Sequence, residues 1–204
     1  MLLPPKTVLF NPVELNGIHA RLIPLQFQHL EDLFTAGIRS DIWTYMSIVV
    51  QSLDDMHRLV SEALQSYEKG AELPFVIIDQ KTDSIVGSTR LLDLTPFHRN
   101  AEIGWTWLNP SVWRTPVNTE CKYLLLCHCF ETIGLMRVML KTDARNFRSQ
   151  SAIERLGGRK EGVLRKHRIL PDGFIRDTVV YSIIREEWPE VKARLESFLL
   201  PREE

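Results

Sequence analysis

The sequence switches repeatedly between two hydrophobic periods, and this alternation restricts the chain to folds that combine helices with a central sheet. Apolar side chains recur at every second residue in some segments, as in half-buried strands, and at every third or fourth residue in others, as in amphipathic helices. In chain order the pattern predicts one strand, two helices, three strands, a helix, a strand, a helix, two strands and a final helix. Such a mixed order predicts an α+β or α/β domain around one sheet.

Turn and cap residues predict the boundaries of these elements. Ser52, with Asp55 three residues later, predicts a capped helix start, and Gly70 predicts the end of that helix. We expect Asn118 to cap the next helix and Gly157 to follow the end of a shorter one. The predicted strands cover residues 18–25, 75–78, 85–92, 101–108, 138–142, 161–169 and 174–184, and the other helices cover 27–38, 147–156 and 186–199.

Periodicity also predicts which side chains share a face. In strand 101–108 a period of two places Glu102, Gly104 and Thr106 on one face, and Ile103, Trp105 and Trp107 on the other. The final helix is expected to present five apolar residues on one side: Trp188, Val191, Leu195, Phe198 and Leu199.

Composition places the chain among globular proteins. Its 204 residues suit a single domain over 1–204, with a core at about 13–184, and 44% of them are hydrophobic. The net charge of −1 argues against a nucleic-acid partner. No apolar run approaches the ~18 residues that a membrane span needs, and the first residues lack a signal-peptide core. We therefore expect a cytoplasmic protein with no membrane partner.

Three cysteines lie close together, at positions 121, 127 and 129, without a Cys-x-x-Cys pair. The odd count and the spacing argue against a disulfide framework and a structural zinc site, and no metal is expected. Cys127 and Cys129 would project from different sides of a helix, which favours their interpretation as buried apolar residues. A hydrolase that uses Cys121 would lack a paired His and Asp pattern.

The segment 142–157 predicts a strand that leads into a helix start with polar groups. Asn146 and Ser149 are three residues apart, so they share one side of that helix if both enter it. A helix cap followed by a hydroxyl in the first turn explains most such pairs. The alternative is a pair of hydrogen-bonding groups at the carboxyl end of a strand, where α/β proteins often bind ligands.

Six short motifs follow one another between residues 13 and 184. They are Ala-Arg-Leu-Ile-Pro-Leu (20–25), Asp-Ile-Trp-Thr-Tyr-Met (41–46), Ile-Val-Gly-Ser-Thr-Arg (85–90), Ala-Glu-Ile-Gly-Trp (101–105), Asn-Thr-Glu (118–120) and the segment 146–157. In order and spacing the chain resembles the GCN5-related N-acetyltransferase (GNAT) superfamily, and most closely its RimJ/RimL-like branch. The resemblance implies a mixed, mostly antiparallel twisted sheet flanked by helices, with a splay between the fourth and fifth strands, 101–108 and 138–142.

The resemblance also implies an activity: an acetyl-CoA-dependent N-acetyltransferase that moves an acetyl group directly to a primary amine. The acceptor would be a protein N-terminus, a small amine or an aminoacyl compound. Glu102 is implied as a base that acts through water, and Ser149 as a proton donor to the leaving thiolate. The implied cofactor-binding residues are Trp105, Thr106, Trp107, Arg114, Val117, Asn118, Thr119, Asn146 and Arg148, and the implied acceptor-binding residues are Trp43, Tyr45 and Met46.

Several alternatives stay open at this stage. The implied phosphate loop 113–118 has no glycine, and Pro116 has no N–H. This departure favours, as the second hypothesis, a non-catalytic acyl-CoA-binding or regulatory domain of the same fold. Glu102 could be a solvated strand carboxylate, and Trp43 a core residue. The basic run 165–168 is expected on a solvated surface, or against the CoA 3′-phosphate or an acidic substrate. A homodimer is a further expectation.

Overall fold

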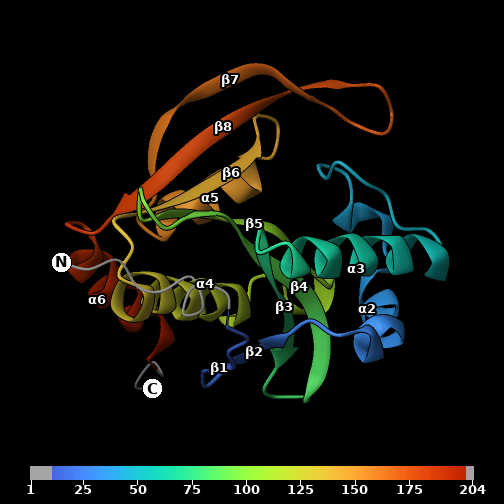
Figure 1. The fold of residues 1–204 in the computed structure, drawn as a ribbon, viewed down its shortest axis with the longest axis horizontal. Coiled ribbons are helices and arrows are strands. Elements are labelled where there is room, and N and C mark those ends of the chain that lie inside the picture. The colour runs from blue at the N-terminus through green and yellow to red at the C-terminus, as the bar shows by residue number, and fades with distance from the viewer. Residues whose placement is uncertain (1–10, 201–204) are drawn as a thin grey trace.

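The computed structural model describes residues 11–200, and these form an eight-stranded sheet in the order β1-β2-β3-β4-β5-β6-β8-β7 (Figure 1). Neighbouring strands are antiparallel except for the parallel pair β5 and β6. The predicted mixed, mostly antiparallel sheet is therefore confirmed. The strands are β1 (Leu15–Asn16), β2 (Ala20–Pro24), β3 (Glu72–Asp79), β4 (Ser84–Thr95), β5 (Asn100–Leu108), β6 (Arg137–Asp143), β7 (Arg159–Ile169) and β8 (Ile175–Ile184).

The helices follow in the predicted order, and the short strand β1 is the only addition to the predicted strands over residues 11–200. The expected helix 27–38 divides into a 3-10 turn and an α-helix. The α-helices are α2 (Leu30–Gly37), α3 (Leu53–Glu68), α4 (Val117–Cys127), α5 (Phe147–Arg155) and α6 (Trp188–Leu199), with short turns η1 (Phe27–His29), η2 (Ser40–Ile42) and η3 (Pro110–Val112) and a π-helical turn η4 (His128–Ile133).

Local chemistry explains where the helices begin and end. Ser52 and Asp55 form the predicted capping box: the Ser52 hydroxyl accepts from the Asp55 N–H, and the Asp55 carboxylate accepts from the Ser52 N–H. Gly70 follows α3 with φ of +66°, and Gly157 follows α5 with φ of +103°. Both glycines take the left-handed conformation that ends a helix at little steric cost.

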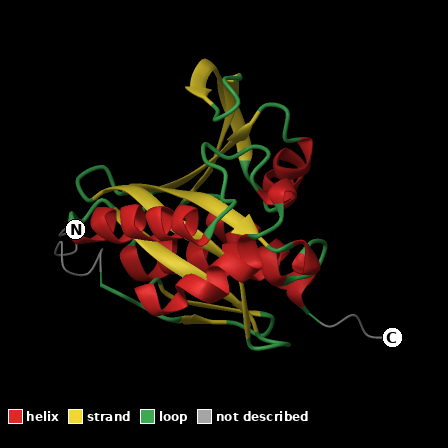
Figure 2. Ribbon diagram, turned by 90° about the vertical axis from the view of Figure 1, so that its right-hand side faces the viewer, coloured by secondary structure: helices red, strands yellow, loops and turns green. Residues whose placement is uncertain are grey.

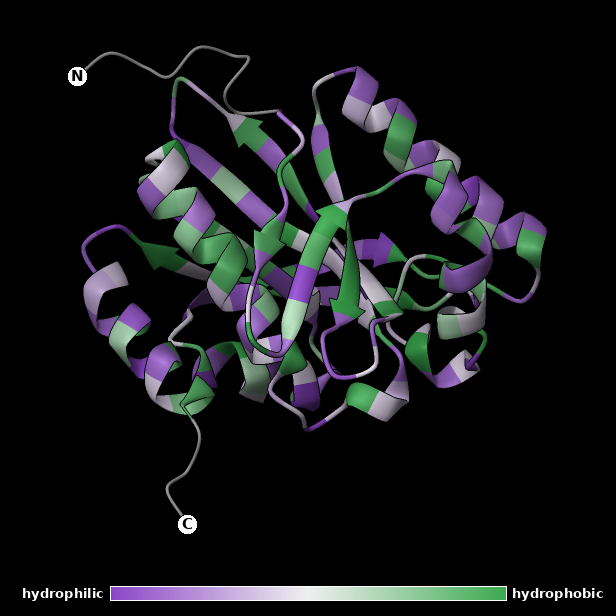
Figure 3. Cartoon of the chain, turned by 90° about the horizontal axis from the view of Figure 1, so that it is seen from below, coloured by the Kyte–Doolittle hydropathy of each residue, from purple (hydrophilic) through white to green (hydrophobic). Residues whose placement is uncertain are grey.

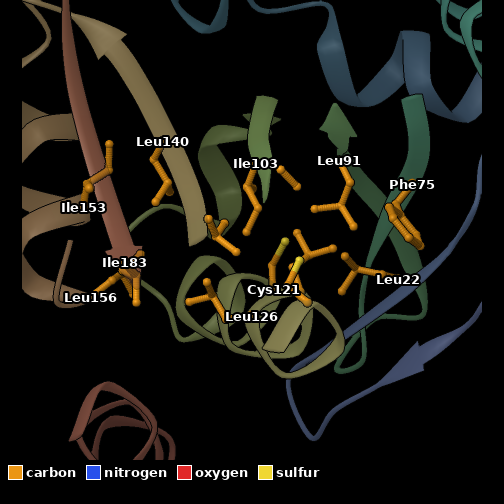
Figure 4. Close-up of a cluster of buried hydrophobic side chains, with 14 of the residues drawn as sticks. Leu22, Phe75, Leu91, Ile103, Cys121, Leu126, Leu140, Ile153, Leu156 and Ile183 are labelled. Atoms are coloured by element: carbon orange, nitrogen blue, oxygen red, sulfur yellow. The ribbon is translucent and has the colours of Figure 1, made fainter. Parts of the chain in front are cut away.

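Two apolar clusters pack against opposite faces of the sheet. The first cluster joins the sheet to α4, α5 and α6, and Figure 4 shows its side chains meeting above α4. The second cluster joins β3 and β5 to α2, α3 and the segment around Trp43 and Val50. Seen by hydropathy, green hydrophobic stretches run along the central strands, while the outer helices mix green with purple (Figure 3). On α6, Trp188, Val191, Leu195 and Leu199 are buried, whereas Phe198 is 39% exposed.

The two halves of the sheet differ in how they are covered. Strands of the N-terminal half (β1 to β5) contribute to both clusters, whereas none of the described residues of β6, β7 and β8, which form the C-terminal half, belongs to the second cluster. The β7–β8 hairpin extends beyond the helical layers (Figure 2). One face of the C-terminal half-sheet, formed by β6, β8 and β7, is therefore left without a helix packed on it.

Predictions about both ends of the chain lie outside the described residues. The absence of a signal-peptide core was read from the first residues, which belong to 1–10, and a domain over 1–204 also includes 201–204. Within 11–200, none of the helices has the length and apolar character of a membrane span.

Candidate active site

The parallel strands β5 and β6 separate after a short paired stretch (Figure 1). Their pairing runs from Asn100 opposite Arg137 to Ile103 opposite Leu140. β5 continues to Leu108 and β6 to Asp143, but these later residues do not pair with each other. The predicted splay between these two strands is therefore confirmed.

A β-bulge lies at the point where β5 leaves β6. The register between β4 and β5 shifts between Ser88 and Arg90, so that Thr89 alone lies opposite both Trp105 and Thr106. Trp105 has φ of +51°, a left-handed conformation that is rare for a bulky residue. Backbone strain of this kind, at the unpaired edge of a strand, marks a candidate functional site.

The bulge overturns the predicted face alternation of this strand. Ile103 packs in the first cluster, whereas Trp105 and Trp107 pack in the second cluster, across the sheet. The prediction that these three residues share a face is wrong, because one extra residue in a strand shifts the period of two by one position.

A buried polar network lies on the α4 side of the bulge. The Thr106 hydroxyl lies 2.7 Å from the Thr89 hydroxyl and accepts a hydrogen bond of 2.5 Å from the Lys122 ammonium group. Lys122 is 6% exposed and pairs with no carboxylate of the described chain. Burial lowers the pKa of Lys122, because an apolar environment disfavours the charged ammonium form.

The start of α4 has free backbone donors. α4 begins at Val117, directly after Pro116, so the prediction that Asn118 caps this helix is wrong. Pro116 has φ of −63°, which suits a helix start without a side-chain cap. The N–H groups of Asn118 and Thr119 have no hydrogen-bond partner within residues 11–200. Free N–H groups at a helix N-terminus favour an anion.

A buried carboxylate anchors this helix to the N-terminal strands. Glu120 is 3% exposed and accepts hydrogen bonds from the N–H groups of Ile18, His19 and Ala20 at 2.5–2.9 Å. Gly17 lies against the same carboxylate, where an added Cβ would come within 2.4 Å of it. The position of the α4 start therefore depends on Glu120.

The start of α5 lies near the loop that precedes α4. The Arg148 guanidinium stacks 3.8 Å from the ring centroid of Trp113, and Arg155 donates a hydrogen bond of 2.8 Å to the Thr119 hydroxyl. Arg114 is exposed on the same loop, with φ of +63°. Three arginines thus contact or belong to the loop before α4 and its first turn.

Asn146 caps α5, as the first interpretation of the Asn146 and Ser149 pair predicts. Its side-chain oxygen accepts a hydrogen bond of 3.0 Å from the Ser149 N–H. The Ser149 side chain is half-buried. The parts that these residues play toward a ligand stay predictions.

Glu102 is a buried, paired carboxylate, so the alternative of a solvated strand residue is wrong. It is 7% exposed, and one carboxylate oxygen lies 2.6 Å from the Lys141 ammonium on β6. Burial raises the pKa of Glu102 above its usual range, and Lys141 opposes this shift only in part. A carboxyl group with a raised pKa beside an unpaired strand edge suits a general base.

The candidate acceptor residues divide between the core and the surface. Trp43 is 1% exposed, packs 5.2 Å from the Trp107 ring centroid and donates a hydrogen bond to the Gly37 carbonyl, so it lies beneath the surface. Tyr45 and Met46 are half-buried. The Tyr45 carbonyl accepts a hydrogen bond of 3.2 Å from Arg176 on β8, which ties this loop to the β7–β8 hairpin.

Further charged residues stand at the end of β6. Asp143 is 1% exposed and accepts hydrogen bonds from the Arg145 backbone and guanidinium, which hold the pKa of Asp143 below its usual range. The Arg145 guanidinium also stacks 3.5 Å from the ring centroid of Phe174. Sequence reasoning missed Lys141, Asp143, Arg145 and Arg176, and also Lys122, whose position within an apolar helix stripe was an available signal.

The three cysteines do not form a site. Cys121 and Cys129 are fully buried, and Cys127 is half-buried. Burial raises the pKa of Cys121 to about 11, so its thiol stays protonated near neutral pH. This finding argues against a thiolate nucleophile.

The matches to known proteins agree with this geometry. The family model "Acetyltransferase (GNAT) domain" matches residues 19–159. The uncharacterized N-acetyltransferase YoaA of Bacillus subtilis (strain 168) is 25% identical over 78% of this chain and 89% of its own length. The ribosomal-protein-serine acetyltransferase of Escherichia coli (strain K12) is 25% identical over 72% of this chain and 82% of its own length.

A solved structure shares the whole architecture. A GCN5-related N-acetyltransferase from Brucella melitensis superimposes with a TM-score of 0.87 and 27% sequence identity, over 94% of this chain and 87% of its own. The resemblance to the GNAT superfamily and its RimJ/RimL-like branch is thus confirmed. The chain belongs to the GNAT family of acetyltransferases.

Proposed function

We propose that this acetyltransferase uses acetyl-CoA and transfers the acetyl group directly to a primary amine. The observation that carries the proposal is the separation of β5 from β6 beyond Ile103, with the bulge at Trp105 directly after it. An unpaired strand edge offers N–H and C=O groups to an extended amide-containing arm such as pantetheine. Acetyl-CoA would supply the acetyl group as a thioester.

The residues around the separated strands fit this cosubstrate despite the loop without glycine. The unpaired N–H groups of Asn118 and Thr119 would bind the pyrophosphate, and Arg148 and Arg114 would add positive charge. Pro116 has no N–H, but it lies before the helix and leaves these two donors free. A Mycobacterium smegmatis RimJ structure of the same fold, 22% identical with a TM-score of 0.80, was solved with CoA-disulfide.

The surroundings of three groups support the roles that we propose for them. Glu102 would take a proton from the acceptor amine through a water molecule, because its raised pKa suits a base. The Ser149 hydroxyl would donate a proton to the leaving sulfur. Backbone N–H groups near Trp105 would stabilise the negative charge that develops on the carbonyl oxygen. One relative acts, by its name, on a serine of a ribosomal protein, which favours a polypeptide acceptor.

The test is CoA release from acetyl-CoA by the purified chain with a panel of amines and N-terminal peptides. We expect acetyl-CoA to raise Tm, because a ligand that binds only the folded state stabilises it. Arg148→Gln should reduce that rise, and Arg194→Gln, an exposed change on α6, should not. Stabilisation by acetyl-CoA with no CoA release from any acceptor would favour the non-catalytic alternative. A cytoplasmic location and a homodimer stay predictions.

A further inference from the structure

The open face of the C-terminal half-sheet carries more positive than negative charge next to Glu102. Core residues of β6 and β8 point toward α5 and α6, so the alternate residues, Lys141, Asp143 and Arg176 among them, lie on the face without a helix. Glu102 belongs to this face, because it pairs with Lys141. These side chains therefore border the surface from which an acceptor would approach the unpaired edge of β5.

The three carboxylates of β5, β6 and β7 on this face, Glu102, Asp143 and Glu161, are already paired, the last of them with Arg137. Lys141 pairs with Glu102, and Arg145 pairs with Asp143. Arg168 and Arg176 remain, and neither forms an ion pair with a carboxylate within residues 11–200. Two arginines without an ion pair of their own are thus left beside the candidate site.

The two remaining arginines lie directly opposite each other on β7 and β8. Like charges in opposite positions of an antiparallel pair destabilise the sheet, so this arrangement costs free energy in the free protein. Arg176 is also partly desolvated: its guanidinium donates hydrogen bonds to the Thr178 hydroxyl and the Tyr45 carbonyl, and burial lowers its pKa. A bound anion would relieve the repulsion between the two arginines.

From this juxtaposition we propose that the acceptor carries an anionic group, a carboxylate in the first instance, close to the amine that is acetylated, and that Arg176 and Arg168 bind it. The inference rests on the proposed function and specifies its substrate class. Guanidinium groups suit a carboxylate because their paired N–H donors match its two oxygens. The same surplus charge disfavours a polycationic acceptor.

The test compares acceptors that differ only in the carboxylate. One arm uses tyrosine against tyramine, and a second uses peptides that begin Ser-Asp against peptides that begin Ser-Asn. We expect the anionic member of the effective arm to be preferred by about 10- to 100-fold in kcat/KM, mainly through a lower KM. A preference for tyrosine would indicate a free amino acid as the acceptor, and a preference for the Ser-Asp peptides would indicate an acidic polypeptide N-terminus.

Variants then assign the preference to the two arginines. Arg176→Gln should remove the preference, and Arg176→Lys should retain part of it. Arg168 is exposed, and its side chain forms no hydrogen bond with residues 11–200, so Arg168→Gln should reduce the preference without affecting the fold. Arg194→Gln on α6 is the matched control and should keep the full preference. Equal turnover of both members, a preference for the neutral one, or an unchanged preference in Arg176→Gln would overturn the proposal.

A binding measurement separates this proposal from the proposed function. Calorimetry with the product-like N-acetyltyrosine and N-acetyltyramine needs no turnover. If no acceptor releases CoA, but N-acetyltyrosine still binds better than N-acetyltyramine and Arg176→Gln abolishes the difference, the anion site stands and the enzymatic proposal fails. If CoA is released but neither assay shows a preference, the enzymatic proposal stands and the anion site fails.

Discussion

The N-terminal and C-terminal halves of the sheet differ in how their charged side chains are paired. In the N-terminal half, helices pack on both faces, and buried charges such as Glu120, which accepts from three backbone N–H groups, have specific partners, with Lys122 as the exception. In the C-terminal half, one face has no helix, and Arg168 and Arg176 lie opposite each other, neither of them in an ion pair with a carboxylate of residues 11–200. The first arrangement holds the bulge and the α4 start in place, and the second leaves charge available to a ligand.

The largest expected effect is on the free energy of unfolding, and the test breaks one ion pair in each half of the sheet. Arg90 on β4 is buried, pairs with Glu72 at 2.9 Å and stacks 4.7 Å from the Trp105 ring centroid. Arg90→Gln should lower the free energy of unfolding by about 3–5 kcal/mol, because it removes a buried guanidinium and leaves the Glu72 carboxylate, which is 18% exposed, unpaired. Arg137→Gln, which breaks the more exposed pair with Glu161, should cost less than about 1 kcal/mol. Urea unfolding measures both, and equal costs would contradict the difference between the halves.

The next effect concerns catalysis at the boundary between the halves. Glu102→Gln should lower kcat by about 100-fold, in the range typical of general base catalysis, without abolishing turnover. Because burial raises the pKa of Glu102, its carboxylate forms only above the usual glutamate range. The kcat/KM of the unchanged chain should therefore rise with pH through this pKa, and the variant should lose that acid limb. Glu190→Gln, an exposed change on α6, should keep it. A variant that retains the limb would exclude Glu102 as the base.

How much the sequence could predict also differs between the halves. The covered strands contain continuous apolar runs such as 75–78, and these, with the Ser52 and Gly70 signals, were enough to place the sheet and α3. The bulge could not be predicted, because Trp105 is apolar and fits the period of two as a core residue would. Only pairing with β4 shows that the register shifts there.

The sequence predicts a residue of the candidate site well when its contacts are local, and less well when its partner is distant in the sequence. Asn146 is a helix cap by residue type and spacing alone. The ion pair of Glu102 with Lys141 joins residues on different strands, and so does the opposition of Arg168 and Arg176. A charged residue in a strand sequence suggests a solvated face, and only the tertiary pairing shows that Glu102 is buried.

A smaller effect separates the two polar residues at the α5 start. Asn146→Ala should cost about 1 kcal/mol of stability, because it removes the side-chain acceptor of the Ser149 N–H, and it should weaken acetyl-CoA binding. Ser149→Ala should leave stability nearly unchanged and slow turnover instead. Thermal unfolding and calorimetry with acetyl-CoA measure the two contributions. Weaker cofactor binding in Ser149→Ala than in Asn146→Ala would reverse the assigned roles.

The smallest expected effect concerns Lys122, the buried cation of the N-terminal half that has no carboxylate partner within residues 11–200. Its pKa is lowered in the folded state, so between that pKa and the unfolded value the unfolded chain binds more protons, and stability should rise as pH rises. Lys122→Met removes the charge at similar volume, while Thr106 keeps its hydrogen bond with Thr89. We expect stability within about 1 kcal/mol of the unchanged chain at pH 7, and no rise from this group at alkaline pH. Urea unfolding at pH 7 and pH 9.5 measures the difference. If the stability of the two proteins changes with pH in the same way, the pKa of Lys122 does not differ between the folded and unfolded states. That result would remove the contrast between this buried cation and the arginines on the open face of β7 and β8.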